Sequence, residues 1–523
     1  MTEKPNVLLI VIDQFRADLL DGRLAETANL KNLNALAEEC CFFRNHFTVV
    51  TPCGPSRVSL FTGQYARNHR AVRNGTPLRH DTPNLALQMR SVGYDPLLFG
   101  YTDVTQDPRV LEADDPRLNS YEEVLPGFAE VVRHRQDTDV DAWRRYLSAK
   151  GYDVPEGNGI YVPAGETIDA PALYRSEDSD TAFLTDQFLE HMGDANKGWF
   201  AALTYIRPHP PFVAPEPFNR RYCPDKIPAP LVHEDSQTHA FVEAVRQTKP
   251  VSGLVEGFPD LEASADTVNT IRSLYLGLAA EVDHHIGRVV DWLKSSNQWD
   301  DTILVVTADH GEMLGDFGVW GKGTVYDAAY HVPLMIRAPG QQPRRFDGMS
   351  ESIDVTPTIL DLVGAEIPDA MNGSSLRSAM ETGKGGKSVS FSELDFGDPI
   401  YPTEIQKELG LSACAANLAI LRSQTHRLVH FAADLPQIVF DITRDGEARD
   451  VSSLPEGEAF CLDLSRKMLC HALTHPESTF AWTMVTETGV KRRTGQVSGR
   501  FDNASREHAV ADNGHDATEP KEG

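Results

Sequence analysis

A cysteine, a proline and an arginine lie close together in the stretch TPCGPSRVSLFTG, at residues 51–63. Pro55 suits the first turn of a helix, where its missing N–H group has no partner to lose, so we expect a helix to begin near it. Cys53 then lies at the helix N-terminus, whose free N–H groups and dipole favour an anion. Arg57 follows one turn later on the same side, where it would bind that anion or hold the loop. The stretch predicts a reactive group beside an anion-binding helix end.

Polar residues also follow three apolar stretches that we expect to be buried strands. NVLLIVI is followed by Asp13 and Gln14, TILVVTA by Asp309 and His310, and GWFAALTYI by RPHPPF with His209. In open α/β sheets, ligands bind beyond the carboxyl ends of the strands. Two carboxylates, an amide oxygen and an imidazole at neighbouring strand ends predict a site for one divalent cation. Taken singly, each of these residues is also typical of a turn or a helix cap, and for His209 that alternative stays open.

A metal ion and a nucleophile at a helix start are the parts of phosphoryl and sulfuryl transfer sites. Charge that develops on the transferred group needs fixed positive partners, and the nucleophile needs activation. A plain thiolate, however, is a poor partner for a hard cation that is bound by oxygen ligands. The thiol of Cys53 therefore needs a further explanation.

Composition limits the classes of partner. The 523 residues carry a formal net charge of −27, and nucleic-acid binding needs clustered Lys and Arg, so we expect no nucleic-acid partner. No stretch approaches the roughly 18 to 20 apolar residues that a membrane span needs, and the first apolar run is too short for a signal peptide. The seven cysteines are odd in number and lack CxxC spacing, which excludes a disulfide framework or zinc ribbon. We expect a cytoplasmic protein without a membrane partner.

The order of the expected elements predicts an α/β fold with a large mixed, mostly parallel sheet sandwiched by helices. Apolar strands and amphipathic helices alternate through the first two-thirds of the chain. We assign residues 1–385 to a catalytic domain with an insertion at about 105–180, and residues 386–496 to a smaller C-terminal α+β domain. The polar stretch 497–523 is expected to be a tail or an oligomerisation arm.

The motifs together resemble one known family. C-G-P-S-R-V-S-L-F-T-G is similar to the signature of type I sulfatases in the alkaline phosphatase superfamily, and DQFR, GYTD, RPHPPF, DHGE and GKGTVYD follow in family order. The resemblance spans roughly residues 5 to 480. Three features are most similar to the phosphonate monoester hydrolase and phosphodiesterase branch. They are Asp13–Gln14, where most sulfatases have two aspartates, Asp309–His310, where arylsulfatases usually have Asp–Asn, and GYTD in place of GKWH.

The resemblance explains the cysteine. In that family a formylglycine-generating enzyme oxidises it to formylglycine, whose hydrate attacks phosphorus or sulfur and then releases the acid by C–O cleavage. Here this implies formylglycine from Cys53 and one divalent metal ion, with the choice among Mn, Ca and Zn left open. The implied metal ligands are Asp13, Gln14, Cys53, Asp309 and His310.

The resemblance also implies roles for other residues. Arg57 would support the formylglycine hydrate, His209 and Lys322 would protonate the leaving group and bind charged oxygens, and Asn74 and Tyr101 would add hydrogen bonds. For Lys322, Asn74 and Tyr101 the alternatives of a solvated loop, a turn and core packing stay open. Asp103 departs from the branch, which has a threonine there, and would repel a second anionic oxygen or bind a cationic group.

These observations favour a metal-dependent hydrolase of phosphonate monoesters and phosphodiesters, promiscuous toward sulfate esters, with a small anionic ester as substrate. The first alternative is an arylsulfatase with the same residues, since a sulfate ester and a phosphodiester each carry one negative charge. A non-catalytic binding protein on this fold is a distant alternative, and a two-metal phosphatase would need more ligands than these strand ends supply. By resemblance we expect a homo-oligomer, a dimer or tetramer.

Overall fold

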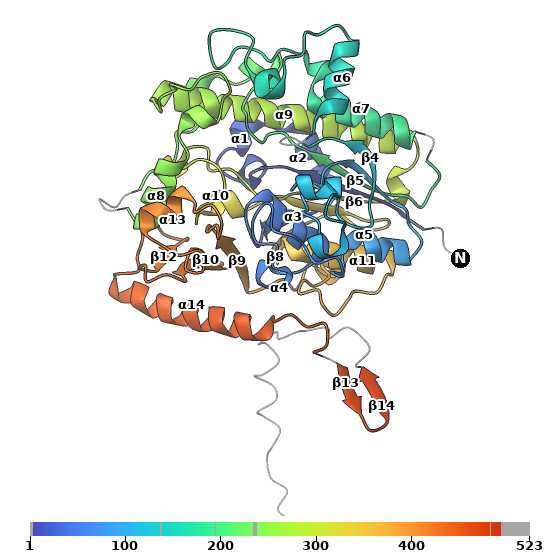
Figure 1. Ribbon diagram of the computed structural model, residues 1–523, viewed down its shortest axis with the longest axis vertical. Helices are drawn as coiled ribbons and strands as arrows, with labels where there is room; N and C mark the ends of the chain where they lie inside the picture. Colours follow the sequence, from blue (N-terminus) through green and yellow to red (C-terminus); the bar gives the residue numbers. More distant parts are fainter. Residues whose placement is uncertain (1–3, 136–138, 194, 234–237, 482, 493–523) are drawn as a thin grey trace, which may run out of the picture.

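An eight-stranded sheet forms the centre of the protein, covered by helices on both faces (Figure 1). The computed structural model describes residues 4–135, 139–193, 195–233, 238–481 and 483–492. The predicted tail at 497–523 lies outside the described residues. The strands are β1 Asn6–Ile12, β2 Cys41–Phe47, β3 Pro96–Gly100, β4 Ala129–Arg133, β5 Phe200–Tyr205, β6 Thr302–Ala308, β7 Leu334–Arg337, β8 Arg344–Glu351, β9 Val389–Asp395, β10 Asn417–Ser423, β11 His426–Phe431, β12 Ile438–Asp441, β13 Thr483–Thr486 and β14 Gly489–Arg492.

The helices connect these strands and cover the sheet. They are α1 Ala25–Ala28, α2 Lys31–Glu39, α3 Cys53–Thr62, α4 Ala66–His69, α5 Leu85–Ser91, α6 Asp141–Ala149, α7 Asp180–Met192, α8 Ala240–Thr248, α9 Ala265–Ser295, α10 Asp327–Tyr330, α11 Val355–Val363, α12 Arg377–Thr382, α13 Glu404–Leu409 and α14 Pro455–Thr474. Short 3-10 turns lie between them. None of the described helices has the length and apolar character that crossing a membrane requires.

The large sheet has the strand order β4-β3-β5-β1-β6-β7-β2-β8. Only β7 runs against its neighbours, β6 and β2, while the other neighbouring pairs are parallel. All seven residues of β1 are buried, as expected for a central strand with helices on both faces. The insertion expected at 105–180 contributes β4, which pairs with β3 at the sheet edge.

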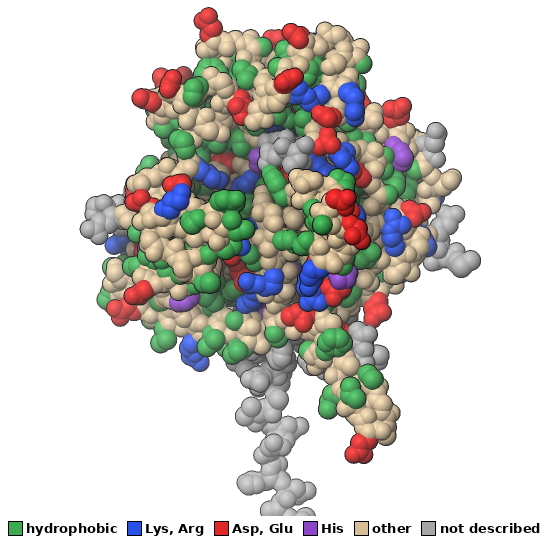
Figure 2. Space-filling view, viewed as in Figure 1, with side chains coloured by type: hydrophobic (Ala, Val, Ile, Leu, Met, Phe, Trp, Pro, Cys, Tyr) green, Lys and Arg blue, Asp and Glu red, His purple; other side chains and the backbone are tan. Residues whose placement is uncertain are grey.

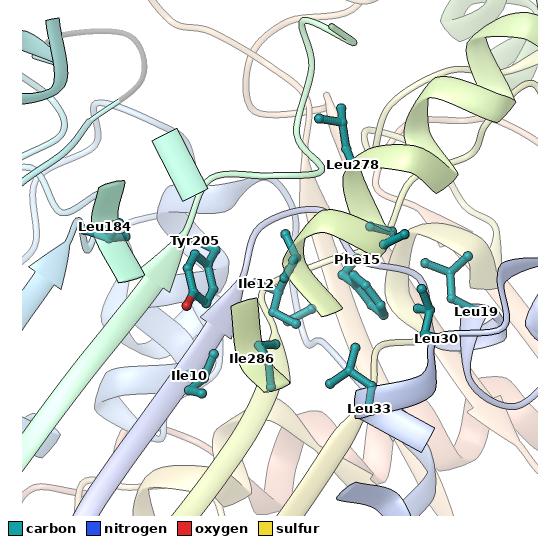
Figure 3. Close-up of a cluster of buried hydrophobic side chains, with 14 of the residues drawn as sticks. Ile10, Ile12, Phe15, Leu19, Leu30, Leu33, Leu184, Tyr205, Leu278 and Ile286 are labelled. Atoms are coloured by element: carbon teal, nitrogen blue, oxygen red, sulfur yellow. The ribbon is translucent and has the colours of Figure 1, made fainter. Parts of the chain in front are cut away.

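The two faces of β1 enter two different hydrophobic clusters. Leu8, Ile10 and Ile12 pack with α2, α7 and α9, and Figure 3 shows Ile10 and Ile12 close to Ile286 of α9. The alternate residues of the strand pack on the opposite face with α3, α5 and α11. This alternation follows from the two-residue period of a strand, and it holds β1 rigidly between the helical layers.

From Val389 onward the chain forms an antiparallel sheet with the order β12-β11-β10-β9. Leu418 and Val429 of this sheet share a hydrophobic cluster with Phe47 and Tyr330 of the first part of the chain. Helix α14 packs on β11 and β12. The domain boundary at residue 385 stays a prediction, because the two parts share this core.

Candidate active site

The ends of β1 and β6 bring four potential metal ligands together. Ile12 lies opposite Ala308 in the parallel pairing of these strands, so the residues that follow, Asp13 and Asp309, leave the sheet side by side. Asp13, Cys53, Asp309 and His310 are buried, and each offers one ligand atom within 4.8 Å of those of the other three. The strand-end prediction from the sequence therefore describes a real cluster.

Helix α3 places Cys53 at this cluster. Cys53 is the first residue of the helix, and its Sγ lies 3.2 Å from Nε2 of His310 and 3.2 Å from Nζ of Lys322. The next residue, Gly54, donates its backbone N–H to Oδ1 of Asn74 over 3.0 Å. Asn74 thus holds the helix start in place through its carbonyl oxygen.

Arg57 lies beneath the cluster and is fully buried. Its Nε donates to Oδ2 of Asp309 over 2.9 Å, and its Nη2 approaches Oδ2 of Asp13 at 3.3 Å. The other donors bind Tyr101: Nη1 reaches its carbonyl oxygen at 3.2 Å and Nη2 its hydroxyl oxygen at 2.8 Å. The guanidinium also stacks on the Tyr101 ring, 3.9 Å from its centroid. Arg57 therefore joins the two carboxylates to Tyr101 in one hydrogen-bonded group, and its expected role toward a bound anion or the formylglycine hydrate stays a prediction.

Gln14 and Lys322 complete the cluster. Oε1 of Gln14 accepts a hydrogen bond from Nζ of Lys322 over 2.6 Å, and the Gln14 backbone N–H donates to Oδ1 of Asp309 over 3.1 Å. Gln14 has a φ of 63°, a left-handed conformation that a residue other than glycine adopts only where its surroundings hold it. Lys322 is 9% exposed, so the alternative of a solvated loop lysine does not describe it.

Glu312 is a site residue that the sequence analysis left without a role. Gln14 Nε2 donates to its Oε2, and its Oε1 accepts from the backbone N–H groups of Leu314 at 3.0 Å and Gly321 at 2.7 Å. Glu312 therefore fixes the direction of the Gln14 amide, with the oxygen toward Lys322. It is the last residue of the DHGE motif. The sequence therefore shows that a glutamate follows the metal-ligand candidates, but it does not show the contact of that glutamate with Gln14.

The electrostatics of the cluster suit a bound cation. Burial and the Asp309 charge raise the pKa of Asp13, and burial raises the pKa of the Cys53 thiol well above its ordinary value. Burial lowers the pKa of His310 to about 4, which leaves a neutral imidazole that can act as a ligand. Oδ1 of Asp13 is buried without a hydrogen-bond partner among the described residues. Such an orphaned oxygen beside a neutral imidazole and a second carboxylate fits a divalent cation.

Of the remaining predicted residues, Tyr101 lies in the buried cluster and His209 lines a separate cavity. The Tyr101 hydroxyl donates to Asp13 within the buried cluster, so this tyrosine holds the Asp13 carboxyl in place. His209 follows β5, the neighbour of β1, and lines a cavity of about 220 Å³ with Tyr161, Pro211 and Glu256. The ring Nδ1 of His209 lies 2.6 Å from the carbonyl oxygen of Pro210. The structure does not bring His209 among the contacts of Cys53 described above.

Two further charged residues flank the cluster. A Cβ on Gly321 would lie 2.8 Å from Nζ of Lys249, so this exposed lysine, which follows α8, reaches the backbone beside Lys322. No motif marked Lys249, because only the folding of α8 against the loop brings it there. On the other side, Asp103 lies against Gly54, and burial and Glu122 raise the pKa of its carboxyl well above the ordinary value.

With this geometry in hand, comparison with known proteins defines the class. The family model described as Sulfatase matches residues 5–365, and the chain belongs to the sulfatase family. A multifunctional alkaline phosphatase superfamily protein from Trinickia caryophylli is 35% identical over 520 residues, 94% of this chain and 100% of the relative. A choline-sulfatase from Rhizobium meliloti is 26% identical over 87% of this chain and 84% of the relative.

Two solved structures are similar to this chain along almost its whole length. The phosphonate monoester hydrolase of Silicibacter pomeroyi has a TM-score of 0.92 and 50% identity, covering 95% of this chain and 100% of that one. The phosphonate monoester hydrolase of Agrobacterium radiobacter has a TM-score of 0.85 and 35% identity, covering 94% and 100%. The predicted fold class, a large mixed sheet sandwiched by helices in the manner of alkaline phosphatases and sulfatases, is confirmed.

Proposed function

We propose that this protein is a metal-dependent ester hydrolase that uses formylglycine at position 53 to cleave phosphonate monoesters and phosphodiesters. The observation that carries the proposal is the buried cluster of Asp13, Cys53, Asp309 and His310, with Lys322 against the Cys53 sulfur. The likeness to two phosphonate monoester hydrolases along almost the whole chain supports it.

Each residue of the cluster has a separate task in this proposal. Asp13, Gln14, Asp309, His310 and the modified residue 53 would hold one divalent cation. When bound, such a cation neutralises developing charge and lowers the pKa of a nearby hydroxyl. Manganese, calcium and zinc all suit this mixture of oxygen and nitrogen ligands.

Two positively charged side chains, Lys322 and Arg57, act on the substrate and on the carboxylates. Lys322 points at the position of the nucleophile and would bind a non-bridging oxygen of the ester, where a fixed donor is most effective. Arg57, engaged by Asp13 and Asp309, lowers the pKa of both carboxylates and so opposes the effect of burial on them. His209 remains our candidate for protonating the leaving group, and Asn74 acts through Gly54 by fixing the start of α3.

The modification would precede folding. Cys53 is 6% exposed, so a formylglycine-generating enzyme would have to act on the chain before the sheet and α3 enclose the thiol. The described cysteines are all free, which agrees with the cytoplasmic location that we propose.

Mass spectrometry of the peptide containing Cys53 tests the nucleophile, using protein produced together with a formylglycine-generating enzyme. We expect a mass about 18 Da below that of the thiol form, the difference between a thiol and the aldehyde that serves as the covalent catalyst. Turnover of a phosphonate monoester, a phosphodiester and a sulfate ester is then measured on the same preparation. Full activity with an unmodified thiol would overturn the proposal.

Sulfate ester hydrolysis is the second candidate function. Relatives that carry sulfatase names, including the choline-sulfatase, support it, and a sulfate ester has the single negative charge of a phosphodiester. The Asp13–Gln14 and Asp309–His310 pairs favour the phosphonate and phosphodiester assignment. Relative kcat/KM values for the three esters decide between the candidates.

We also propose that the protein forms a homo-oligomer, a dimer or tetramer, through its C-terminal part. Leu462, Leu469 and Leu473 of α14 are 68%, 61% and 71% exposed, and their spacing places them along one face of the helix. The hairpin β13–β14 projects from the body and exposes Val485 and Val490 (Figures 1 and 2). A two-stranded hairpin is marginally stable alone, so a second copy is the partner that we propose. Light scattering of Leu469→Glu against the unaltered protein tests this.

A further inference from the structure

Asp103 is a buried carboxylate beside the nucleophile with an oxygen that nothing satisfies. Its side chain follows β3 and is 5% exposed, and its Oδ1 has no hydrogen-bond partner among the described residues. Its Oδ2 would lie 3.5 Å from a Cβ on Gly54, and its carbonyl oxygen 3.2 Å from the same point. Gly54 is the residue after Cys53, so the carboxyl lies against the start of α3.

The backbone at Asp103 is held in an unusual conformation. Its φ is 54°, in the left-handed region that non-glycine residues seldom adopt, and such conformations cluster at functional sites. Hydrogen bonds fix the backbone on both sides of Asp103. The Tyr101 N–H donates to the Thr204 hydroxyl over 2.7 Å, and the Val104 N–H donates to the Glu123 carbonyl over 3.1 Å. The position of the carboxyl is therefore fixed by the loop.

The two cations of the active-site cluster donate to groups other than Asp103. Arg57 directs its donors to Asp309, Asp13 and Tyr101, and Lys322 donates to Gln14 and to the sulfur of Cys53. Glu122, also buried, adds a second acidic group close to Asp103. A buried carboxylate normally has a paired cation or a full set of donors. Among the described residues, Asp103 has no ion pair and its Oδ1 has no donor, so a positive charge from outside the chain would satisfy it.

We propose that Asp103 selects esters that carry an ammonium group close to the reacting phosphorus or sulfur atom. The inference rests on the proposed ester hydrolysis and deepens it, because it names the substrate class of the same site. A substrate whose reacting atom lies at residue 53 places its non-reacting substituent near Gly54, within reach of this carboxyl. The chemical class is a zwitterion: one negative charge on the ester group for Lys322 and the metal ligands, and one positive charge on the substituent for Asp103.

A pair of esters that differ in a single charge tests the assignment. The 4-nitrophenyl monoesters of 2-aminoethylphosphonate and of propylphosphonate share the leaving group and nearly the same shape, since an ammonium group replaces a methyl group. We expect the unaltered, metal-loaded protein to prefer the amino ester in kcat/KM by about tenfold or more, the effect of a well-placed charge pair in a desolvated site. Asp103→Asn should bring the ratio close to one, through a loss confined to the amino ester.

The control is Asp114→Asn, which removes one negative charge from the exposed surface of the same segment and should leave the ratio unchanged. Equal kcat/KM values for the two esters in the unaltered protein, or equal losses for both esters in Asp103→Asn, would overturn the proposal. The second pattern would show that the carboxyl only supports the loop.

Binding to a Cys53→Ala protein separates this inference from the proposed function. Calorimetry of both esters with Cys53→Ala, and with Asp103→Asn in the same background, measures recognition without turnover. A tighter Kd for the amino ester that depends on Asp103 supports the inference even where neither ester is hydrolysed by the unaltered protein. Equal Kd values contradict it even where both esters are hydrolysed.

Discussion

Two clusters of buried charge in this protein differ in whether their oxygen atoms are satisfied. In the first, Lys387 donates to Oδ1 of Asp354 over 2.8 Å and also to Glu351. Tyr65 donates its hydroxyl to Oε2 of Glu351 over 2.6 Å, and the Phe391 N–H donates to Oε1 over 2.6 Å. Oδ2 of Asp354 accepts from the Glu351 N–H at 2.9 Å. Every carboxylate oxygen of this closed cluster has a donor.

The active-site cluster is arranged differently. Arg57 and Lys322 supply positive charge, yet Oδ1 of Asp13 and Oδ1 of Asp103 are buried without a partner among the described residues. A charge cluster that only supports the fold is stable when its own members satisfy it. A cluster that must receive a cation and a substrate keeps ligand atoms free. In this comparison the unsatisfied oxygens, and neither burial nor charge, distinguish the active-site cluster from the closed cluster.

The largest expected effect is the loss of turnover in Cys53→Ala. Removing the nucleophile should lower kcat/KM for a phosphonate monoester by at least about 10³-fold, while the midpoint of urea unfolding stays close to that of the unaltered protein. Cys41→Ala, which removes a buried thiol from β2, is the matched control, and it should lower stability without lowering turnover per folded molecule. If Cys53→Ala kept substantial activity, the active-site cluster would be a structural one.

Lys322→Ala comes next, with an expected loss of about 10²- to 10³-fold in kcat/KM, the effect of removing one donor aimed at developing charge. Lys249→Ala removes a second positive charge that reaches Gly321 but does not touch the Cys53 sulfur, and it should cost only severalfold. Steady-state kinetics on one phosphonate ester compare the two. Similar losses would mean that the general positive potential matters more than the contact at residue 53.

Lys387→Met should act on the closed cluster in the opposite way, lowering stability and sparing catalysis. It leaves Glu351 and Asp354 buried without their cation, a change that costs about 3 kcal/mol of unfolding free energy. Lys407→Met breaks an exposed pair with Glu404 and should cost less than about 1 kcal/mol. Urea denaturation measures both, and a large drop in kcat for folded Lys387→Met would contradict the separation of the two clusters.

The two clusters also differ in how far the sequence predicts them. Asp13 and Asp309 could be placed together because their apolar strands are recognisable and parallel strands end at the same edge of a sheet. The closed cluster could not be predicted, since Tyr65, Glu351 and Lys387 come from separate segments with no motif to join them. The sheet of β9–β12 was visible as a change of pattern near residue 385, but its shared core with Phe47 and Tyr330 depends on tertiary packing.

Within the active site, residue type was predictable and orientation was not. The motifs gave Gln14, Arg57 and Lys322, yet only the folded chain shows that Arg57 turns inward to Asp309 and that Lys322 reaches the sulfur. The loop from Glu312 to Lys322 folds back on itself, with the Met313 N–H donating to the Gly321 carbonyl over 3.0 Å, and this fold places Lys322. Asp103 was flagged as a departure from the family, and the structure adds that its oxygen has no partner.

The smallest of these effects concerns Glu312, which contacts Gln14, one of the proposed metal ligands. In Glu312→Gln, one side-chain atom still accepts from the Leu314 and Gly321 N–H groups, so the new amide nitrogen faces Nε2 of Gln14. Two donors cannot pair, and the Gln14 amide should turn its oxygen away from the cluster. Loss of a group that orients a ligand costs about tenfold or more in metal affinity.

Calorimetric titration of the metal-stripped protein with Mn²⁺ measures this, independently of turnover. Glu351→Gln is the matched control from the closed cluster: it should lower the midpoint of unfolding and leave the Mn²⁺ affinity unchanged. An unchanged affinity in Glu312→Gln would show that Gln14 keeps its direction through Lys322 alone. The distinction matters because the direction of the Gln14 amide decides whether the cluster offers the cation an oxygen or a nitrogen, and only an oxygen lone pair serves as a ligand.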